Sequence, residues 1–260
     1  MNFQRRTSKT LELLGEHGSL EVPELSKMLG VSAVTIRRDL NLLAERGLIV
    51  RTRGGAMSIK ESDPIPFKNK ATTRQKEKDY IARLAARFID DGDTIFLDCG
   101  STVFAIAPYL KGKTITVITN SLPLTHALLD SRVKINLVGG EVDQERMAIH
   151  GSVAGQHIAR YKATKAFIGV DGVSVERGLS SNSEKEAEVT LSMMRQAKKV
   201  FLLCDSTKLG HDKYLSFAPI SSIHYLVTDN EAKEEVLSKY RRAGLLVIVD
   251  SEGQKWEKPS

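Results

Sequence analysis

The sequence predicts an α/β protein of two domains, in which a small winged helix-turn-helix domain precedes a larger Rossmann-like α/β domain. In the first sixty residues, two short amphipathic helical patterns are separated by one glycine and followed by a basic strand and a Gly-Gly pair. From residue 73 onward, short apolar runs alternate with helical patterns, which is typical of a mostly parallel sheet covered on both faces. A chain of 260 residues is long enough for both domains.

The helix predicted to begin after Ser32 is the centre of the first domain. Serine is a preferred N-cap residue. One face of this helix is apolar at helical spacing and carries Ile36, Leu40 and Leu43. The opposite face and its flanks carry Val34, Thr35, Arg37, Arg38 and Asn41. A helix with an apolar back and two adjacent arginines near its front is suited to lie on an anionic surface. A solvated amphipathic helix is the alternative for an isolated Arg-Arg pair.

The flanking segments complete a winged helix-turn-helix. A short amphipathic helix is expected before the turn at Gly30, on the pattern Leu20, Val22, Leu25, Met28 and Leu29. Gly47 is placed to end the second helix. Residues 48–53 are predicted to form a strand with Arg51 and Arg53 on one face, which Gly54-Gly55 turns back into a hairpin. In such a domain the second helix enters the major groove, and the hairpin reaches the DNA backbone or the minor groove.

The domain boundaries follow from the same patterns. A first helix is predicted over residues 3–16, and the winged-helix domain is expected to cover 1–57. A linker is expected at 58–72, because the two prolines within 63–66 exclude helix and favour an extended path. Residues 73–260 are expected to form an effector-binding and oligomerisation domain.

The positive charge is concentrated in the first domain. Residues 1–60 hold ten Lys and Arg against six Asp and Glu, a net charge of +4, whereas the whole chain carries +6. A basic excess located in one segment is the footprint expected of a nucleic-acid-binding surface, whereas a generally basic protein would spread it evenly.

Cysteine usage and hydropathy indicate a protein of the cytoplasm that does not bind a membrane. The two cysteines, Cys99 and Cys204, cannot build a disulfide framework or a metal cage, and each follows an apolar run, so both are expected to be buried thiols. Residues 1–10 are polar and lack the apolar core of a signal peptide. No apolar run approaches the roughly 18 residues of a membrane span.

The second domain is expected to contain seven strands separated by helices. The predicted strands are 94–97, 115–119, 134–138, 166–170, 200–203, 225–228 and 245–249. A helix through Ile81, Leu84, Ala85 and Phe88 precedes them. The helices expected between them are 103–110, 123–129, 153–161, 184–196 and 231–243.

Polar turns follow the first five of these strands, where ligands bind in open α/β sheets. The candidate ligand-binding residues in these turns are Asp98, Gly100, Ser101, Thr102, Asn120, Ser121, Gly139, Gly140, Asp171, Gly172 and Lys208. Each type is common in turns, so a structural role is the alternative for any one of them. Together they suit a small phosphorylated polyol. Its anion would lie at a helix N-terminus near Lys208, and its hydroxyls at Asp98, Asp171 and Asn120.

Other residues near these turns carry two interpretations each. His150 and His211 line the site or are surface or hydrogen-bonded histidines, and Arg146 lies on a loop from which it could reach a phosphate. The charged run of Lys185, Glu186 and Glu188 is interpreted as a solvated helix face. No ligand spacing indicates a metal or another cofactor, and neither a nucleophile elbow nor a full P-loop is present.

The chain resembles the DeoR-type bacterial transcriptional regulators over nearly its whole length. The resemblance rests on Thr35-Ile36-Arg37-Arg38-Asp39-Leu40 followed by Leu43, Gly47, Arg51, Arg53, Gly54 and Gly55. It implies repression of sugar-catabolism genes that is relieved by a phosphorylated sugar intermediate.

The effector domain of this family is similar to ribose-5-phosphate isomerase. Asp98-x-Gly100-Ser101-Thr102 matches the sugar-phosphate loop of both, and Asp171-Gly172 matches the first half of the isomerase Asp-Gly-Ala-Asp pattern. The last position of that pattern is Ser174 here. A carboxylate in that neighbourhood would be needed for proton transfer, so its loss disfavours catalysis and leaves binding intact.

The leading hypothesis is therefore a ligand-controlled repressor with no catalytic residues. Arg38 and Val34 would face base edges of double-stranded operator DNA. Phosphates would be contacted by Ser32, Thr35, Arg37, Arg51 and Arg53. Because one helix-turn-helix has a small footprint, a homodimer or homotetramer is expected, associated with the nucleoid when bound. The alternative is a sugar-phosphate isomerase-like enzyme with an appended DNA-binding module.

Overall fold

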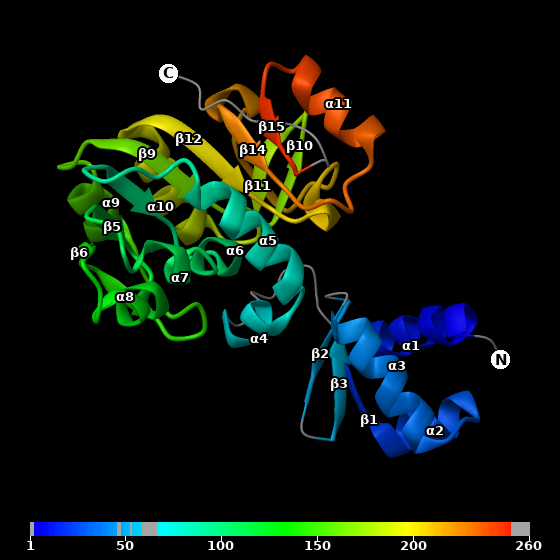
Figure 1. The fold of residues 1–260 in the computed structure, drawn as a ribbon. Helices are drawn as coiled ribbons and strands as arrows, with labels where there is room; N and C mark the ends of the chain where they lie inside the picture. Colours follow the sequence, from blue (N-terminus) through cyan, green and yellow to red (C-terminus); the bar gives the residue numbers. More distant parts are fainter. Residues whose placement is uncertain (1–2, 46–47, 53, 59–66, 251–260) are drawn as a thin grey trace. The chain divides into compact units, whose positions relative to one another are not determined.

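The computed structural model describes residues 3–45, 48–52, 54–58 and 67–250, which divide into two compact units (Figure 1). The N-terminal unit is Met1–Gln75 and the C-terminal unit is Lys76–Ser260. The proline-containing segment 63–66 that predicted a linker lies outside the described residues, as do Gly47 and Arg53. The predicted domain boundaries remain predictions.

The N-terminal unit packs three helices against a small antiparallel sheet. Its elements are α1 (Phe3–His17), β1 (Ser19–Glu21), α2 (Val22–Leu29), α3 (Ala33–Glu45), β2 (Ile49–Arg51), β3 (Gly55–Ser58) and α4 (Phe67–Thr72). The strands pair in the order β1-β3-β2, so β2 and β3 form the predicted hairpin. The predicted helices and hairpin are confirmed. The apolar sides of the helices meet in one core that includes Leu14, Leu25, Ile36, Leu40 and Leu43.

Two elements of this unit were not predicted. Leu20 lies in β1 rather than in the helix that follows, because its backbone pairs with Ala56 of β3. Helix α2 begins only at Val22, where the side chain of Glu24 accepts the backbone N–H of Glu21 at 2.7 Å in a capping box. Helix α4 occupies part of the predicted linker, so that part of the segment is helical rather than extended.

The C-terminal unit is built on a seven-stranded parallel sheet (Figure 1). Its order is β15-β14-β12-β9-β4-β5-β6, and every neighbouring pair is parallel. The strands are β4 (Thr94–Leu97), β5 (Thr116–Thr119), β6 (Lys134–Leu137), β9 (Ala163–Ile168), β12 (Ala197–Leu203), β14 (Tyr225–Val227) and β15 (Leu246–Ile248). All seven correspond to predicted strands, which confirms the α/β prediction.

Helices cover both faces of this sheet, and side chains alternate between two cores. Ile95 and Leu97 pack in the core on one face, whereas Phe96 packs in the core on the other. The first core includes residues of α5 (Gln75–Ala86), α6 (Ser101–Phe104), α7 (Ala107–Leu110) and α8 (Leu122–Leu128). The second includes residues of α9 (Ser152–Ile158), α10 (Glu184–Arg195) and α11 (Glu234–Arg242).

The prediction of one continuous helix over 103–110 is wrong. Helices α6 and α7 are separate four-residue helices with Pro108 in the first turn of α7. Proline has no backbone N–H and cannot continue the hydrogen-bond ladder of the preceding turn. The helix N-terminus that was expected near the anion is therefore the start of a helix of only four residues, and the anion-binding role remains a prediction.

Two small antiparallel sheets were also missed. Strands β7 (Glu141–Asp143) and β8 (Ala148–His150) form a hairpin. A three-stranded sheet joins β10 (Gly172–Ser174), β11 (Gly178–Ser181) and β13 (Leu215–Ala218). The 3-10 turns η1 (Ser206–Lys208) and η2 (Ile220–Ser222) complete the unit. In the part of the chain that the structure describes, no helix combines the length and apolar character needed to cross a bilayer.

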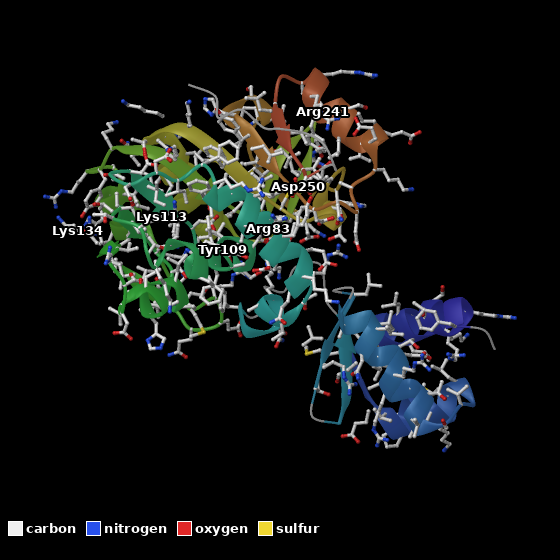
Figure 2. All side chains as sticks on the ribbon, in the orientation of Figure 1. Arg83, Tyr109, Lys113, Lys134, Arg241 and Asp250 are labelled. Atoms are coloured by element: carbon white, nitrogen blue, oxygen red, sulfur yellow. The ribbon has the colours of Figure 1, made fainter. Side chains whose placement is uncertain are left out.

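Helix α5 lies at the start of the C-terminal unit. It is hydrogen-bonded to Asp250, which follows the last strand, β15. The hydroxyl of Tyr80 donates to the carbonyl of Asp250 at 3.0 Å and accepts the backbone N–H of Asp250 at 2.8 Å. Arg83 forms an ion pair with the carboxylate of Asp250 at 3.2 Å (Figure 2).

Candidate functional site

The N-terminus of α3 is capped as the sequence predicts. The backbone N–H of Thr35 donates to the Oγ of Ser32 at 3.3 Å, and the two hydroxyls lie 2.9 Å apart. Gly30 adopts φ +65°, a left-handed conformation that ends α2 and turns the chain toward α3. The predicted helix-turn-helix and its N-cap are therefore confirmed.

The outer face of α3 is exposed and basic. Arg37 and Arg38 are both exposed, and Val34 is 73% exposed despite being apolar. The opposite face is buried at Ile36 and Leu40. Burial of that face holds the backbone of α3 in place, so that the exposed side can present the two guanidinium groups to an anionic partner.

A buried ion pair that sequence reasoning missed holds α1 against α3. Arg6 donates to Asp39 through Nε at 2.6 Å and through Nη2 at 3.1 Å, and the two side chains are 14% and 5% exposed. The hydrogen bond that Arg6 donates to Asp39 raises the pKa of Arg6. Asp39 belongs to the run that carries the family resemblance, yet it is buried and paired rather than presented to a ligand. The only signal for this role was an acidic residue beside the apolar face of α3.

The wing is a tight hairpin, and one of the residues predicted to contact DNA already makes a hydrogen bond within it. Arg51 is half-buried and donates from Nη1 to the carbonyl of Gly55 at 2.7 Å. Gly55 has a steric reason to be glycine, because a Cβ there would lie 2.0 Å from the carbonyl oxygen of Leu20. Arg53, the second predicted wing contact, lies outside the described residues.

In the C-terminal unit, the strand order reverses between β4 and β9. From β4 the sheet continues through β5 and β6, and from β9 it continues in the other direction through β12, β14 and β15. Ligands of open parallel sheets bind at such a reversal, beyond the carboxyl ends of the strands. The predicted turns around Asp98 and Asp171 follow these two strands.

Asp98 bridges the two loops at this reversal. Its Oδ1 accepts the backbone N–H of Gly100 at 2.7 Å, and its Oδ2 accepts the backbone N–H of Gly169 at 2.6 Å. The side chain is buried. Burial raises the pKa of Asp98 to about 6, while the two backbone N–H groups and the nearby Lys208 act in the opposite direction. Asp98 therefore joins the loop after β4 to the loop after β9, and these two loops form the floor of the candidate site.

Lys208 brings a third loop to the same place. Its Nζ donates to the carbonyl of Val170 at 2.7 Å, and its charge is close enough to Asp98 to affect that pKa. The side chain is half-buried. An ammonium group carries three N–H donors, so Lys208 can hold this loop and still donate to an anionic ligand.

The turn after β5 lies beside β8. Asn120 donates from Nδ2 to the carbonyl of Ile149 at 3.0 Å, and the backbone N–H of Ile149 donates to the carbonyl of Asn120 at 2.9 Å. Ser121 caps α8 by accepting the backbone N–H of Leu124 at 3.3 Å. Neither Asn120 Oδ1 nor the buried Thr102 Oγ1 has a hydrogen-bond partner among the described residues.

Arg146 and Glu186 form a buried bidentate ion pair in this neighbourhood. The Nε and Nη2 of Arg146 contact the two carboxylate oxygens of Glu186, and the side chains are 8% and 14% exposed. Burial lowers the pKa of Arg146, but Glu186 more than offsets this effect and the net shift is upward. The prediction that Glu186 lies on a solvated face is wrong, whereas Lys185 and Glu188 are exposed as predicted.

His150, at the end of β8, is 2% exposed. Within the described part of the chain, neither of its ring nitrogens has a hydrogen-bond partner. Burial lowers the pKa of His150, and the charge of Glu186 acts against this. The same charge raises the pKa of Asp98 and Cys99, so Glu186 lies near all three side chains. The other candidate histidine, His211, is exposed.

Several of the predicted ligand-binding residues also have a structural role that accounts for the amino acid found at that position. Gly140 adopts φ +148°, and a Cβ there would lie 2.8 Å from the carbonyl oxygen of His150. A Cβ on Gly172 would lie 2.4 Å from the carbonyl oxygen of His211. Asp171 accepts the backbone N–H of Asn182 at 3.1 Å. The ligand-binding role assigned to these positions, and to Ser101 and Gly139 with them, remains a prediction.

The two predicted thiols are buried. Cys99 and Cys204 are both free and buried, and burial raises the pKa of each, so both are held as neutral thiols. Among the described residues, no three His, Cys, Asp or Glu side chains gather to form a metal site.

Comparison with known proteins covers both units. The family described as "DeoR-like helix-turn-helix domain" matches residues 6–62, and the family described as "DeoR C terminal sensor domain" matches residues 73–230. A ribose 5-phosphate isomerase A structure from Methanocaldococcus jannaschii shares 17% identity at a TM-score of 0.39, over 52% of this chain and 55% of that chain. That likeness is too distant to bear on the ligand.

Whole-length relatives agree with the family matches. The HTH-type transcriptional repressor GlcR of Bacillus subtilis (strain 168) is 36% identical over 98% of this chain and 100% of its own length. The lactose phosphotransferase system repressor of Lactococcus lactis subsp. lactis is 33% identical over 96% of this chain and 100% of its own. The putative aga operon transcriptional repressor of Escherichia coli O157:H7 is 30% identical, over 95% and 94%. These relatives are regulators, which sets aside the isomerase-like alternative. The chain therefore belongs to the DeoR family, as a DNA-binding transcriptional repressor with a C-terminal sensor domain.

Proposed function

We propose that this repressor controls sugar-catabolism genes and that a phosphorylated sugar bound in the C-terminal unit regulates its hold on double-stranded operator DNA. The relatives named for the lactose phosphotransferase system and the aga operon support the link to sugars. The observation that carries the effector half is the convergence of the Asp98, Lys208 and Asn120 turns at the carboxyl edge of the parallel sheet.

On the DNA side, α3 would read bases and the hairpin would contact the backbone. Arg38 would pair with a guanine edge, and Val34 would contact a thymine methyl group. The backbone would be held by Ser32, Thr35, Arg37, Arg51 and Arg53. The exposure of Arg37, Arg38 and Val34 on one helix supports this division of roles.

On the effector side, the phosphate would lie near Lys208 and the backbone N–H groups of residues 100–102. The sugar hydroxyls would lie near Asp98, Asn120 and Asp171. The remaining turn residues, Ser121, Gly139, Gly140 and Gly172, would shape the site. Linkage then requires the effector to bind the DNA-free arrangement more tightly than the DNA-bound one.

The proposal includes pairing of subunits through the C-terminal unit, in a homodimer or homotetramer on repeated half-sites. The winged-helix domain would be 1–57, the linker 58–72 and the effector and oligomerisation domain 73–260. The protein would act in the bacterial cytoplasm, at the nucleoid when bound to DNA.

The test combines ligand binding with DNA binding. The full chain is screened for thermal stabilisation by hexose and pentose phosphates and by the matching unphosphorylated sugars, because a ligand that binds only the folded state raises the melting temperature. We expect one or more sugar phosphates to stabilise the protein and to change its operator affinity. Stabilisation by none of them, or stabilisation without any effect on operator affinity, would refute the proposed control.

A further inference from the structure

Thr102, Asn120 and His150 are three of the buried side chains whose polar atoms have no partner within the described residues. These open polar atoms are the Oγ1 of Thr102, the Oδ1 of Asn120 and both ring nitrogens of His150. The three residues are 2%, 0% and 2% exposed. Most buried polar groups in folded proteins are hydrogen-bonded, and each exception needs a physical reason.

The open polar atoms come from three different segments, which adjacent strands and hydrogen bonds connect. Thr102 follows the Asp98 loop, and Asn120 is the first residue after β5, which pairs with β4 up to Leu97 and Thr119. His150 follows Ile149, whose backbone is hydrogen-bonded to Asn120 in both directions. The charge of Glu186 raises the pKa of both His150 and Asp98.

We propose that His150 is a specificity-determining residue that hydrogen-bonds the hydroxyl groups of the effector together with Asn120 and Thr102. This inference rests on the proposed function and deepens it, because it divides the site into an uncharged end and an anion-binding end. His150 was one of two candidate histidines in the sequence. It lies outside the turns that follow the strands of the parallel sheet, where the other candidates were placed.

The chemistry of the open polar atoms selects a hydroxyl over a phosphate. Asn120 Oδ1 only accepts hydrogen bonds, so it can pair with a hydroxyl but not with a phosphate dianion. A neutral imidazole offers one donor and one acceptor, and a threonine hydroxyl can act as either. Neighbouring sugar hydroxyls also donate and accept, so they match this set.

The charges nearby favour the same division. Glu186 and Asp143 are negative, the guanidinium of Arg146 is already bound by Glu186, and the exposed Lys185 pairs with Glu141, so this end offers little attraction to an anion. Lys208 is held by the carbonyl of Val170, on the loop after β9. The phosphate therefore belongs at the Lys208 end and the sugar hydroxyls at the His150 end.

The test uses the full chain and the variant His150→Phe, which keeps a ring of similar size and removes both nitrogens. His126→Phe makes the same change at an exposed histidine of α8 and serves as the control. Glucose 6-phosphate, fructose 6-phosphate, ribose 5-phosphate and inorganic phosphate are titrated against each protein by calorimetry and thermal shift.

We expect His150→Phe to lose on the order of tenfold or more in affinity for the sugar phosphate that the unsubstituted protein binds. Its affinity for inorganic phosphate should not change. The ligand-free variant should melt at the same temperature or a few degrees higher, because two unsatisfied buried nitrogens are removed. A purely structural histidine would give a lower melting temperature with ligand affinity retained. If His150→Phe does not fold, His150→Leu provides the same comparison.

Each possible result supports or overturns the proposed role of His150. Unchanged sugar-phosphate affinity in His150→Phe overturns it and leaves the proposed function standing. If His150→Phe loses as much affinity for inorganic phosphate as for the sugar phosphate, the division of the site into an uncharged end and an anion-binding end is overturned. If no sugar phosphate binds the unsubstituted protein, the proposed effector fails and this inference fails with it. A loss confined to sugar phosphates, absent in His126→Phe, supports it.

Discussion

Replacing Glu186 with glutamine should destabilise the C-terminal unit severely. The substitution keeps the size of the side chain and removes its charge. Arg146 would then remain buried beside a neutral amide, without the carboxylate that contacts its Nε and Nη2. The two side chains are 8% and 14% exposed, so water can screen little of this charge.

The magnitude follows from the cost of leaving one member of a buried ion pair alone. Such a change costs about 3–5 kcal/mol, because the remaining charge keeps its desolvation penalty and loses its attraction. For a unit of this size, each kcal/mol lowers the melting temperature by about 2–4 °C. We therefore expect Glu186→Gln to melt roughly 6–20 °C lower than the unsubstituted protein.

The assay is thermal and urea unfolding followed by circular dichroism. Glu188→Gln is the matched control, because it makes the same change at an exposed position of the same helix, and it should stay within about 0.5 kcal/mol. The double variant Arg146→Met with Glu186→Leu should recover most of the loss, since apolar replacements leave no buried charge. Equal stability of Glu186→Gln and Glu188→Gln would refute the reasoning.

Three further predictions concern the other unit and the floor of the site. Arg38→Ala should weaken operator binding by about 1–3 kcal/mol and reduce sequence preference, whereas Arg37→Ala should weaken operator and scrambled DNA alike and lower the salt slope by about one unit. Fluorescence anisotropy measures both, and equal losses of Arg38→Ala on the two DNAs would contradict a reading role. Because burial raises the pKa of Asp98 from 3.8 to about 6, its stabilising contribution is complete below pH 3.8 and is lost as the pH rises through 6. That loss of about 3 kcal/mol should be missing in Asp98→Asn, and identical pH slopes of urea unfolding in the two proteins would exclude it. Gly55→Ala should disrupt the pairing of β1 with β3 and cost more than about 3 kcal/mol. Gly54→Ala, whose Cβ would meet nothing closer than 3.7 Å, should cost less than about 1 kcal/mol, and similar melting temperatures for both would contradict the steric explanation.

The sequence predicts those parts of the fold whose cause is local. The inner strands of the parallel sheet are largely buried, so each contains a continuous apolar run, and the more exposed edge strands β6 and β15 were found as well. The cap at Ser32 and the turn at Gly30 likewise depend on residues a few positions apart. The strand-end turns could be placed because parallel strands bring their carboxyl ends to one edge.

The parts that could not be predicted depend on partners distant in the sequence. Strand β1 is defined by its pairing with β3 rather than by its own three residues. Arg6 and Asp39 are separated by 33 residues, and Arg146 and Glu186 by 40. A charged residue on a helix is interpreted as solvated unless its partner is known, which explains the error at Glu186. The burial of His150 likewise depends on how the β7–β8 hairpin folds against the sheet.

The contacts of Asp250 with Tyr80 and Arg83 mean that the chain enters and leaves the sensor unit at a common junction. Removing the chain from residue 250 onward would release α5 before any strand of the sheet was disturbed. Such a truncation should therefore destabilise the start of the sensor unit, where α5 lies, while the parallel sheet keeps its strand order.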